Sequence, residues 1–138
     1  MQIDDRYWAG IFDGEGTIYF AKDLKCFKIS VAQKEPEILY LMQIRFGGNV
    51  TKDKNRTIHR WNISGALRLR NFLDAVLPFL IVKAVEGRIA KEILEGIRPN
   101  GFGMFPMKPE ERERRQKLRD AMMADRADPK MCDGLPLP

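Results

Sequence analysis

Glu15 is the residue with the clearest chemical potential, because it stands between Gly14 and Gly16 at the end of an apolar segment. The segment from Tyr7 to Phe12 has apolar side chains at helical spacing, which places Glu15 at a helix C-terminus. A carboxylate there faces the negative end of the helix dipole, at a cost of roughly 0.3–1 kcal/mol. A bound divalent cation would make the carboxylate favourable at this helix end, since such cations take carboxylate and carbonyl oxygens as ligands. Glu15 is therefore a candidate metal ligand; the alternative is a solvated acid at a helix end.

Gly10 and Gly14 are four residues apart, so they lie on one face of the expected helix. An interior glycine costs a helix about 1 kcal/mol relative to alanine. Small residues at this spacing allow another backbone to approach closely. The approaching element is either the same helix of a second copy or the protein's own sheet.

After Gly16 the apolar pattern changes from helical spacing to alternation, which predicts strands. Two hairpins are expected, with strands over residues 17–21 and 27–32 and over 50–52 and 58–63. Helices are expected over residues 36–46, 64–77, 82–97 and 110–126. The fold class is α+β, with a four-stranded antiparallel sheet and helices on one face. We expect a core at residues 1–98, a loop and appended charged helix at 99–127, and a flexible tail at 128–138.

Composition is that of a globular domain of 138 residues with 44% hydrophobic residues. No apolar run approaches the ~18 residues of a membrane span, and no secretion signal is visible. Cys26 and Cys132 are read as reduced thiols, so an intracellular location is expected. The net charge of +5 is compatible with a polyanionic partner, although many soluble proteins are as basic.

The stretch Trp8–Gly16 resembles the nine-residue LAGLIDADG motif of homing endonucleases, with Trp8 in place of the leading leucine. Glu15 falls on the essential acidic position of that motif. The order α-β-β-α-β-β-α is similar to that of the family over residues 3–98. The resemblance therefore implies a saddle-shaped sheet and a metal-dependent nuclease.

Two further segments support the resemblance. Val31–Lys34 resembles the strand end that carries a water-organising glutamine, here Gln33. Leu77–Lys83 resembles the segment that carries an active-site lysine, here Lys83. Alone, each of these residues would be read as an ordinary surface residue, and Asp13 as a structural cap.

The resemblance implies a site-specific endonuclease that cleaves double-stranded DNA across the minor groove as a homodimer on a pseudo-palindromic target. Mg²⁺ would be held by Glu15 and the carbonyl of Gly14, with Gln33 orienting water and Lys83 stabilising charge on the phosphate. The dimer interface is expected to contain Trp8, Gly10, Ile11 and Gly14.

The sheet would lie in the major groove, where its outward side chains can read base edges. The expected DNA-binding residues are Tyr19, Lys28, Ser30, Lys34, Lys54, Arg56 and Arg60. Whether Thr51 or Lys52 faces outward is open. The basic residues of the 110–126 helix have two readings: contacts with flanking phosphates, or a solvated face, because acids are interleaved among them. They are Arg112, Arg114, Arg115, Lys117 and Arg119.

Two rival functions remain at this level. The first keeps the fold without the cleavage chemistry, as in an intron maturase or a non-cleaving nucleic-acid-binding protein. The second is a ferredoxin-like domain with no nucleic-acid partner, which would lack exposed basic residues on its sheet. The target sequence and the host, whether phage, bacterial or organellar, are open.

Overall fold

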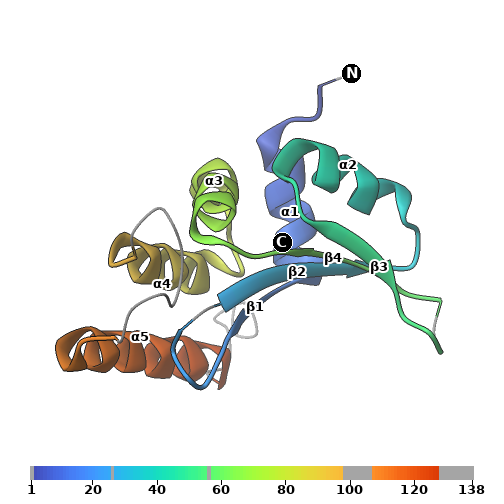
Figure 1. Ribbon diagram of the computed structural model, residues 1–138. Coiled ribbons are helices and arrows are strands. Elements are labelled where there is room, and N and C mark those ends of the chain that lie inside the picture. The colour runs from blue at the N-terminus through green and yellow to red at the C-terminus, as the bar shows by residue number, and fades with distance from the viewer. Residues whose placement is uncertain (1, 26, 56, 98–106, 128–138) are drawn as a thin grey trace.

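The computed structural model describes residues 2–25, 27–55, 57–97 and 107–127 (Figure 1). Arg56, Cys26, residues 99–106 of the expected loop and the 128–138 tail with Cys132 therefore lie outside the described residues. In chain order the elements are α1 (Asp5–Glu15), β1 (Gly16–Phe20), β2 (Phe27–Gln33), α2 (Glu37–Phe46), β3 (Asn49–Lys52), β4 (His59–Ile63), α3 (Ala66–Val76), the 3₁₀ helix η1 (Leu77–Phe79), α4 (Ala84–Glu95) and α5 (Pro109–Ala127).

The strands form one antiparallel sheet in the order β1-β2-β4-β3, which confirms the predicted α+β class. Ile18, Ile29 and Ile63 are paired across β1, β2 and β4, and all three are buried. The next inward row contains Val31 and Trp61, which are fully buried as well. Alternation along each strand thus divides a core face from an outer face, as the sequence pattern predicted.

Helices α1 and α2 pack on the core face of the sheet, and α3 packs beside α1 (Figure 1). The aromatic centre of the core joins Phe12 of α1, Phe46 of α2, Trp61 of β4 and Phe72 of α3. The ring centroids of Phe46 and Phe72 lie 4.9 Å apart and those of Phe12 and Phe72 5.3 Å apart, both edge to face. Such pairs add about 0.5–1.5 kcal/mol to the burial of their surface. No helix among the described residues is long and apolar enough to cross a bilayer.

The helix predicted over residues 82–97 is shorter, and a 3₁₀ helix precedes it. α3 ends at Val76, and η1, with Pro78 at its centre, follows directly. α4 then begins at Ala84, so that Lys83 is its N-cap residue. The prediction placed the start too early because the apolar run Leu80–Val82 reads as helical, whereas its backbone forms an extended residue and a turn.

α5 packs against α4 and covers the free edge of β1. Arg115 donates to the carbonyl of Leu24 at 3.0 Å, Arg119 to that of Phe20 at 3.4 Å, and Arg126 to that of Ile18. Met122 of the same helix is fully buried in the core. Free strand edges invite pairing with other chains, and covering them is a common remedy.

The two sequence readings of α5 therefore need correction. Arg115 is 8% exposed, so it is neither a phosphate ligand nor part of a solvated face. Arg112 and Lys117 remain exposed. The sequence did not reveal this role, because an arginine can donate hydrogen bonds to backbone carbonyls as well as to acids or phosphates.

Gly16→Ala should destabilise the fold by about 1–3 kcal/mol, the usual cost of overpacking a core. A Cβ at residue 16 would lie 2.1 Å from Phe12 Cδ2 and 2.6 Å from the Phe12 carbonyl oxygen. Phe12 is fully buried and cannot move aside. Urea unfolding followed by circular dichroism measures the effect, with Glu95→Ala as control, because Glu95 is exposed at the end of α4 and outside the core. Equal midpoints for the two variants would contradict this close contact.

Candidate active site

α1 ends at Glu15, as predicted, and β1 begins at Gly16, one residue earlier than predicted. The N-terminus of α1 is capped by Asp4, whose side chain accepts a hydrogen bond from the Arg6 amide at 2.8 Å. At the other end no basic residue lies in the last turn, and both Gly14 and Glu15 are exposed. The Glu15 carboxylate thus faces solvent at the negative end of the helix dipole, where a cation is favoured.

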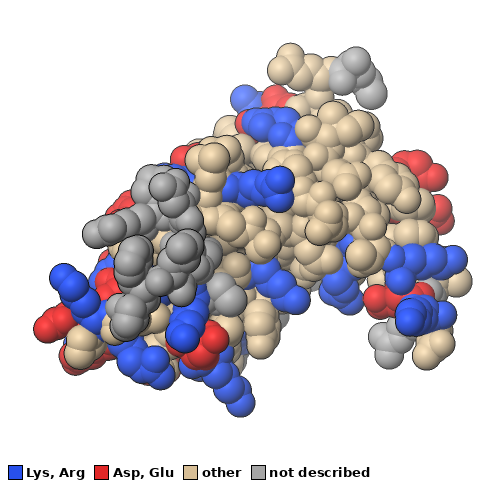
Figure 2. All heavy atoms as spheres, in the orientation of Figure 1, with Lys and Arg blue, Asp and Glu red and all other residues tan. Residues whose placement is uncertain are grey.

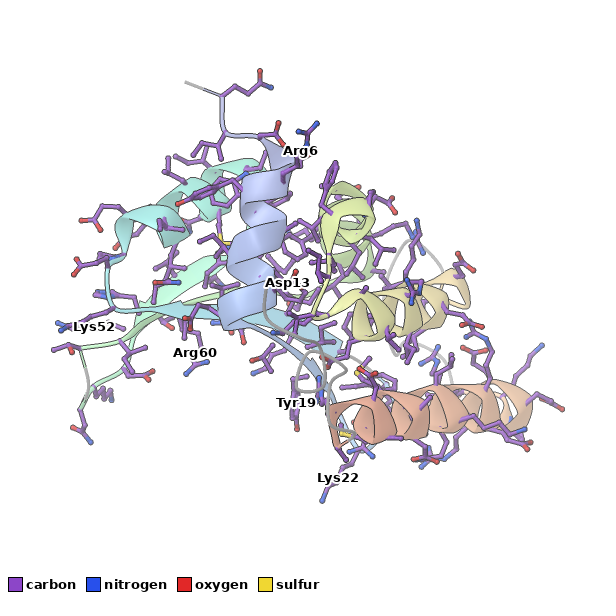
Figure 3. The ribbon with its side chains drawn as sticks, turned by 180° about the vertical axis from the view of Figure 1, so that it is seen from behind. Arg6, Asp13, Tyr19, Lys22, Lys52 and Arg60 are labelled. Atoms are coloured by element: carbon purple, nitrogen blue, oxygen red, sulfur yellow. The ribbon has the colours of Figure 1, made fainter. Side chains whose placement is uncertain are left out.

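Lys83 is brought to the same helix end. Its Nζ donates to the main-chain carbonyl of Asp13 at 2.7 Å and lies 6.0 Å from the centroid of the Phe12 ring. Asp13 is two residues before Glu15, at the end of α1 that meets the sheet (Figure 3). The structure therefore places the ammonium group of Lys83 at the end of the helix that carries Glu15.

Gln33 is the last residue of β2 and is half-buried. The β1–β2 register pairs Val31 with Gly16, the residue that follows Glu15. Gln33 is two residues further along β2, about 7 Å at the usual rise of a strand, at the same end of the sheet as Glu15. His59, which pairs with Gln33, has its Nδ1 3.2 Å from the Lys34 carbonyl oxygen and ties this strand end to β4.

The donor set of this helix end fits a magnesium ion. Carboxylate and carbonyl oxygens are the ligands that Mg²⁺ takes, and one or two carboxylates with phosphate and water usually complete its shell. Among the described residues no group of three or more His, Cys, Asp or Glu side chains is placed to hold a metal. A single chain thus offers the Glu15 carboxylate and nearby carbonyls as ligands. The remaining coordination positions of the ion are left for a second carboxylate, phosphate and water.

The outer face of α1 is bare. A Cβ added at Gly10 or Gly14 would meet no atom within 4 Å, so the reading that these glycines serve packing on the protein's own sheet is wrong. Trp8, predicted to lie in a dimer interface, is also corrected: it is 1% exposed and packs edge-on against Phe46. With about 100° of turn per residue, Trp8 shares its helix face with Phe12 and the core. Tyr7, at 47% exposed, lies on the outer side instead.

Beside this bare face lies an exposed apolar segment, for which no surface role was predicted. Phe79, Ile81 and Val82 are 40%, 84% and 51% exposed, and η1 contacts α1. We call the combined surface the α1/η1 patch; it consists of Tyr7, Gly10, Ile11, Gly14, Phe79, Ile81 and Val82. The available signal in the sequence was the apolar run Leu80–Val82 next to Lys83. Exposed apolar side chains that gather on one surface are typical of interaction sites.

The outer face of the sheet carries the other predicted residues. Tyr19 is 54% exposed, and Lys28, its partner across β1 and β2, has Nζ 5.5 Å from the Tyr19 ring centroid. Tyr19, Lys22 and Arg60 point to the side of the sheet away from α1 and α2 (Figure 3). Thr51 pairs with Arg60 and shares its face, which settles the choice between Thr51 and Lys52.

Positive charge accompanies this face. Figure 2 shows Lys and Arg side chains along the lower rim of the molecule, beneath the sheet, whereas positive and negative side chains alternate on α5. Lys34 and Lys54 are exposed, and the Arg60 guanidinium is 3.9 Å from the Asp53 carboxylate. Ser30 is the exception: it has the outward parity but is only 7% exposed between Thr17 and Asn62, because its side chain is short. The prediction that Ser30 is an exposed DNA-binding residue is therefore wrong.

Comparison with known proteins adds a structural relationship. No protein-family model matches the chain, and no curated protein matches it in sequence. Among solved structures, the homing endonuclease I-CvuI in complex with its target superposes with a TM-score of 0.72 at 20% identity, over 91% of this chain and 83% of that chain. The archaeal intron-encoded homing endonuclease I-Vdi141I, complexed with DNA, gives a TM-score of 0.70 at 20% identity, over 88% and 82%. The chain has the LAGLIDADG homing-endonuclease fold.

The meganuclease I-SmaMI, bound to uncleaveable DNA, has the same LAGLIDADG fold in a longer chain. It superposes with a TM-score of 0.69 at 14% identity, over 88% of this chain but 45% of that one. I-CvuI is also known with 2 mM Mg and with DNA that is not cleaved. At these identities the LAGLIDADG fold is what is shared, and the chemistry of this chain has to be argued from its own residues.

Proposed function

We propose that this protein is a site-specific, Mg²⁺-dependent endonuclease that cleaves double-stranded DNA as a homodimer. The observation that carries the proposal is the end of α1, where the exposed Glu15 carboxylate and the Lys83 ammonium group are held on one helix terminus. An acid and a cation of this kind suit the binding of a metal and of a phosphate. DNA complexes of I-CvuI and I-Vdi141I, which share the fold, support this choice of substrate.

The α1/η1 patch supports the dimer. Gly10 and Gly14 leave the helix surface open, and exposed apolar side chains of η1 and the following turn lie beside it. If a second copy of α1 packs on this face, the two Glu15 carboxylates lie close together at the ends of the paired helices. Two like charges at two negative helix ends repel each other unless cations are bound between them and the substrate. Metal dependence and dimerisation are therefore parts of one arrangement.

Each chain contributes four groups to the reaction. Glu15 and the Gly14 carbonyl hold Mg²⁺, which when bound neutralises phosphate charge and makes its water a better nucleophile. Gln33, at the end of β2, orients water with its side-chain amide. Lys83 places a positive charge where negative charge develops on the phosphate, and such preorganised charges are among the largest contributions to catalysis.

The outer face of the sheet binds the DNA. Tyr19, Lys28 and Arg60 face the major groove, where hydrogen bonds to base edges distinguish all four base pairs. Lys34 and Lys54 lie at strand ends and contact phosphates, and Arg56 is proposed for the same role. Binding through such contacts releases counterions and weakens steeply with salt.

The test is cleavage of a randomised duplex library with sequencing of the new ends. We expect staggered double-strand cuts at a related set of near-palindromic sites in Mg²⁺, and binding without cutting in Ca²⁺. Selective binding with no cutting in either ion would favour the non-cleaving or maturase function. Neither binding nor cutting across the library would overturn the nucleic-acid assignment.

A further inference from the structure

Asp13 joins the end of α1 to the segment that carries Lys83 by three hydrogen bonds. Its two carboxylate oxygens accept from the backbone amides of Ile81 at 2.8 Å and Lys83 at 2.9 Å. Its main-chain carbonyl accepts from Lys83 Nζ at 2.7 Å. Asp13 of α1 therefore binds both the backbone amide and the side-chain ammonium group of Lys83.

Leu80 is buried in the core, but the two residues between it and Lys83 have no such anchor. The side chains of Ile81 and Val82 are 84% and 51% exposed, so packing does not fix them. α4 begins with Lys83 as its N-cap and has no side-chain capping bond of its own. Unsatisfied amides at a helix start need acceptors, and the positive end of the α4 dipole favours a carboxylate there. Asp13 supplies that carboxylate from a different helix.

We propose that Asp13 is a positioning residue for Lys83: it sets the place of the ammonium group beside Glu15 without itself touching the substrate. The inference rests on the proposed endonuclease function. The inference goes beyond that function because it assigns a role to Asp13, the acid that lies two residues before Glu15. Errors of about 1 Å in a catalytic group can cost 10²-fold in rate, so the loss of these bonds should slow cleavage.

A double-mutant cycle separates positioning from simple stabilisation. Asp13→Asn keeps the shape and one acceptor oxygen but turns an NH₂ group towards a backbone amide. We expect single-turnover cleavage, at saturating enzyme with Mg²⁺, to fall about 10²-fold in the otherwise unaltered protein. In the Lys83→Met background the same change should cost less than about 3-fold, because residues that act through one another are not additive. Equal losses in both backgrounds, or no loss in either, would overturn the proposal.

The matched control is Asp74→Asn, which breaks the ion pair between Asp74 of α3 and Lys91 of α4. It removes an Asp–Lys contact in the same region of the fold, away from the end of α1, and should leave the cleavage rate unchanged. Asp13→Ser is a second variant, and circular dichroism shows that each protein compared is folded.

A readout that needs no activity is the rate at which acetic anhydride acetylates each lysine, followed by peptide mass spectrometry on the protein without DNA. Lys83 should react several-fold more slowly than the exposed Lys34 in the unaltered protein, and the difference should shrink in Asp13→Asn. An unchanged ratio would overturn the positioning role. If the unaltered protein cuts no duplex, the proposed function fails, whereas the acetylation ratio still decides whether Asp13 holds Lys83.

Discussion

Glu15→Gln should lower the rate of DNA cleavage by at least about 10²–10³-fold, the effect of removing one charge-stabilising group from an active site. The amide has nearly the shape of the carboxylate but no negative charge, and it is a poor ligand for Mg²⁺. Glu15 is exposed, so the substitution leaves the core untouched. The expected result is a folded protein that binds its target and does not cut it.

Single-turnover cleavage measures the first quantity, and a binding titration in Ca²⁺ measures the second. Glu95→Gln is the matched control, because it makes the same change at an exposed residue at the far end of α4. Cleavage by Glu15→Gln at the unaltered rate would exclude Glu15 as the metal ligand. Loss of binding together with cleavage would show that Glu15 serves the structure of the interface instead.

Gly10→Leu should weaken self-association about 10–100-fold and reduce cleavage in proportion to the dimer lost. The protomer tolerates the new side chain, because a Cβ at Gly10 meets nothing within 4 Å. A second helix packed closely on the same face does not tolerate it, and overpacking costs about 1–3 kcal/mol, or roughly one to two powers of ten in affinity.

Sedimentation equilibrium over a range of protein concentrations gives the dissociation constant, and the melting temperature shows that the protomer remains folded. Ala124→Leu adds the same leucine at an exposed position of α5 and should leave association unchanged. Dimerisation of Gly10→Leu with unaltered affinity would place the contact between copies elsewhere than on the α1/η1 patch.

The parts of the fold that were predictable are those set by local periodicity. Alternation assigned the inward residues Ile18, Ile29 and Trp61, and the change of period at Gly16 located the end of α1. Helical spacing also put Gly10 and Gly14 on one face of the helix, and the structure shows that this face is open. Trp8 was misplaced because the motif match was not combined with helical spacing, which puts Trp8 about 200° around the helix from Gly10.

The parts that were not predictable depend on contacts between distant residues. The bonds from Asp13 to Ile81 and Lys83 span 68 and 70 residues, and no pattern within a window of the sequence indicates them. Ser30 has the correct parity, but its burial depends on the length of neighbouring side chains across the sheet. Likewise, an arginine that binds a distant carbonyl looks the same in sequence as one that binds phosphate.

The arginines of α5 have a consequence for how the protein is made. Arg126 and the Ile18 carbonyl that it binds are 108 residues apart in the chain. At a synthesis rate of about 5–20 residues per second, the outer edge of β1 leaves the ribosome roughly 5–20 seconds before the residue that seals it. During that interval two nascent chains on one message can pair through these edges. The helix that protects β1 in the finished molecule therefore offers no protection while the chain is being synthesised.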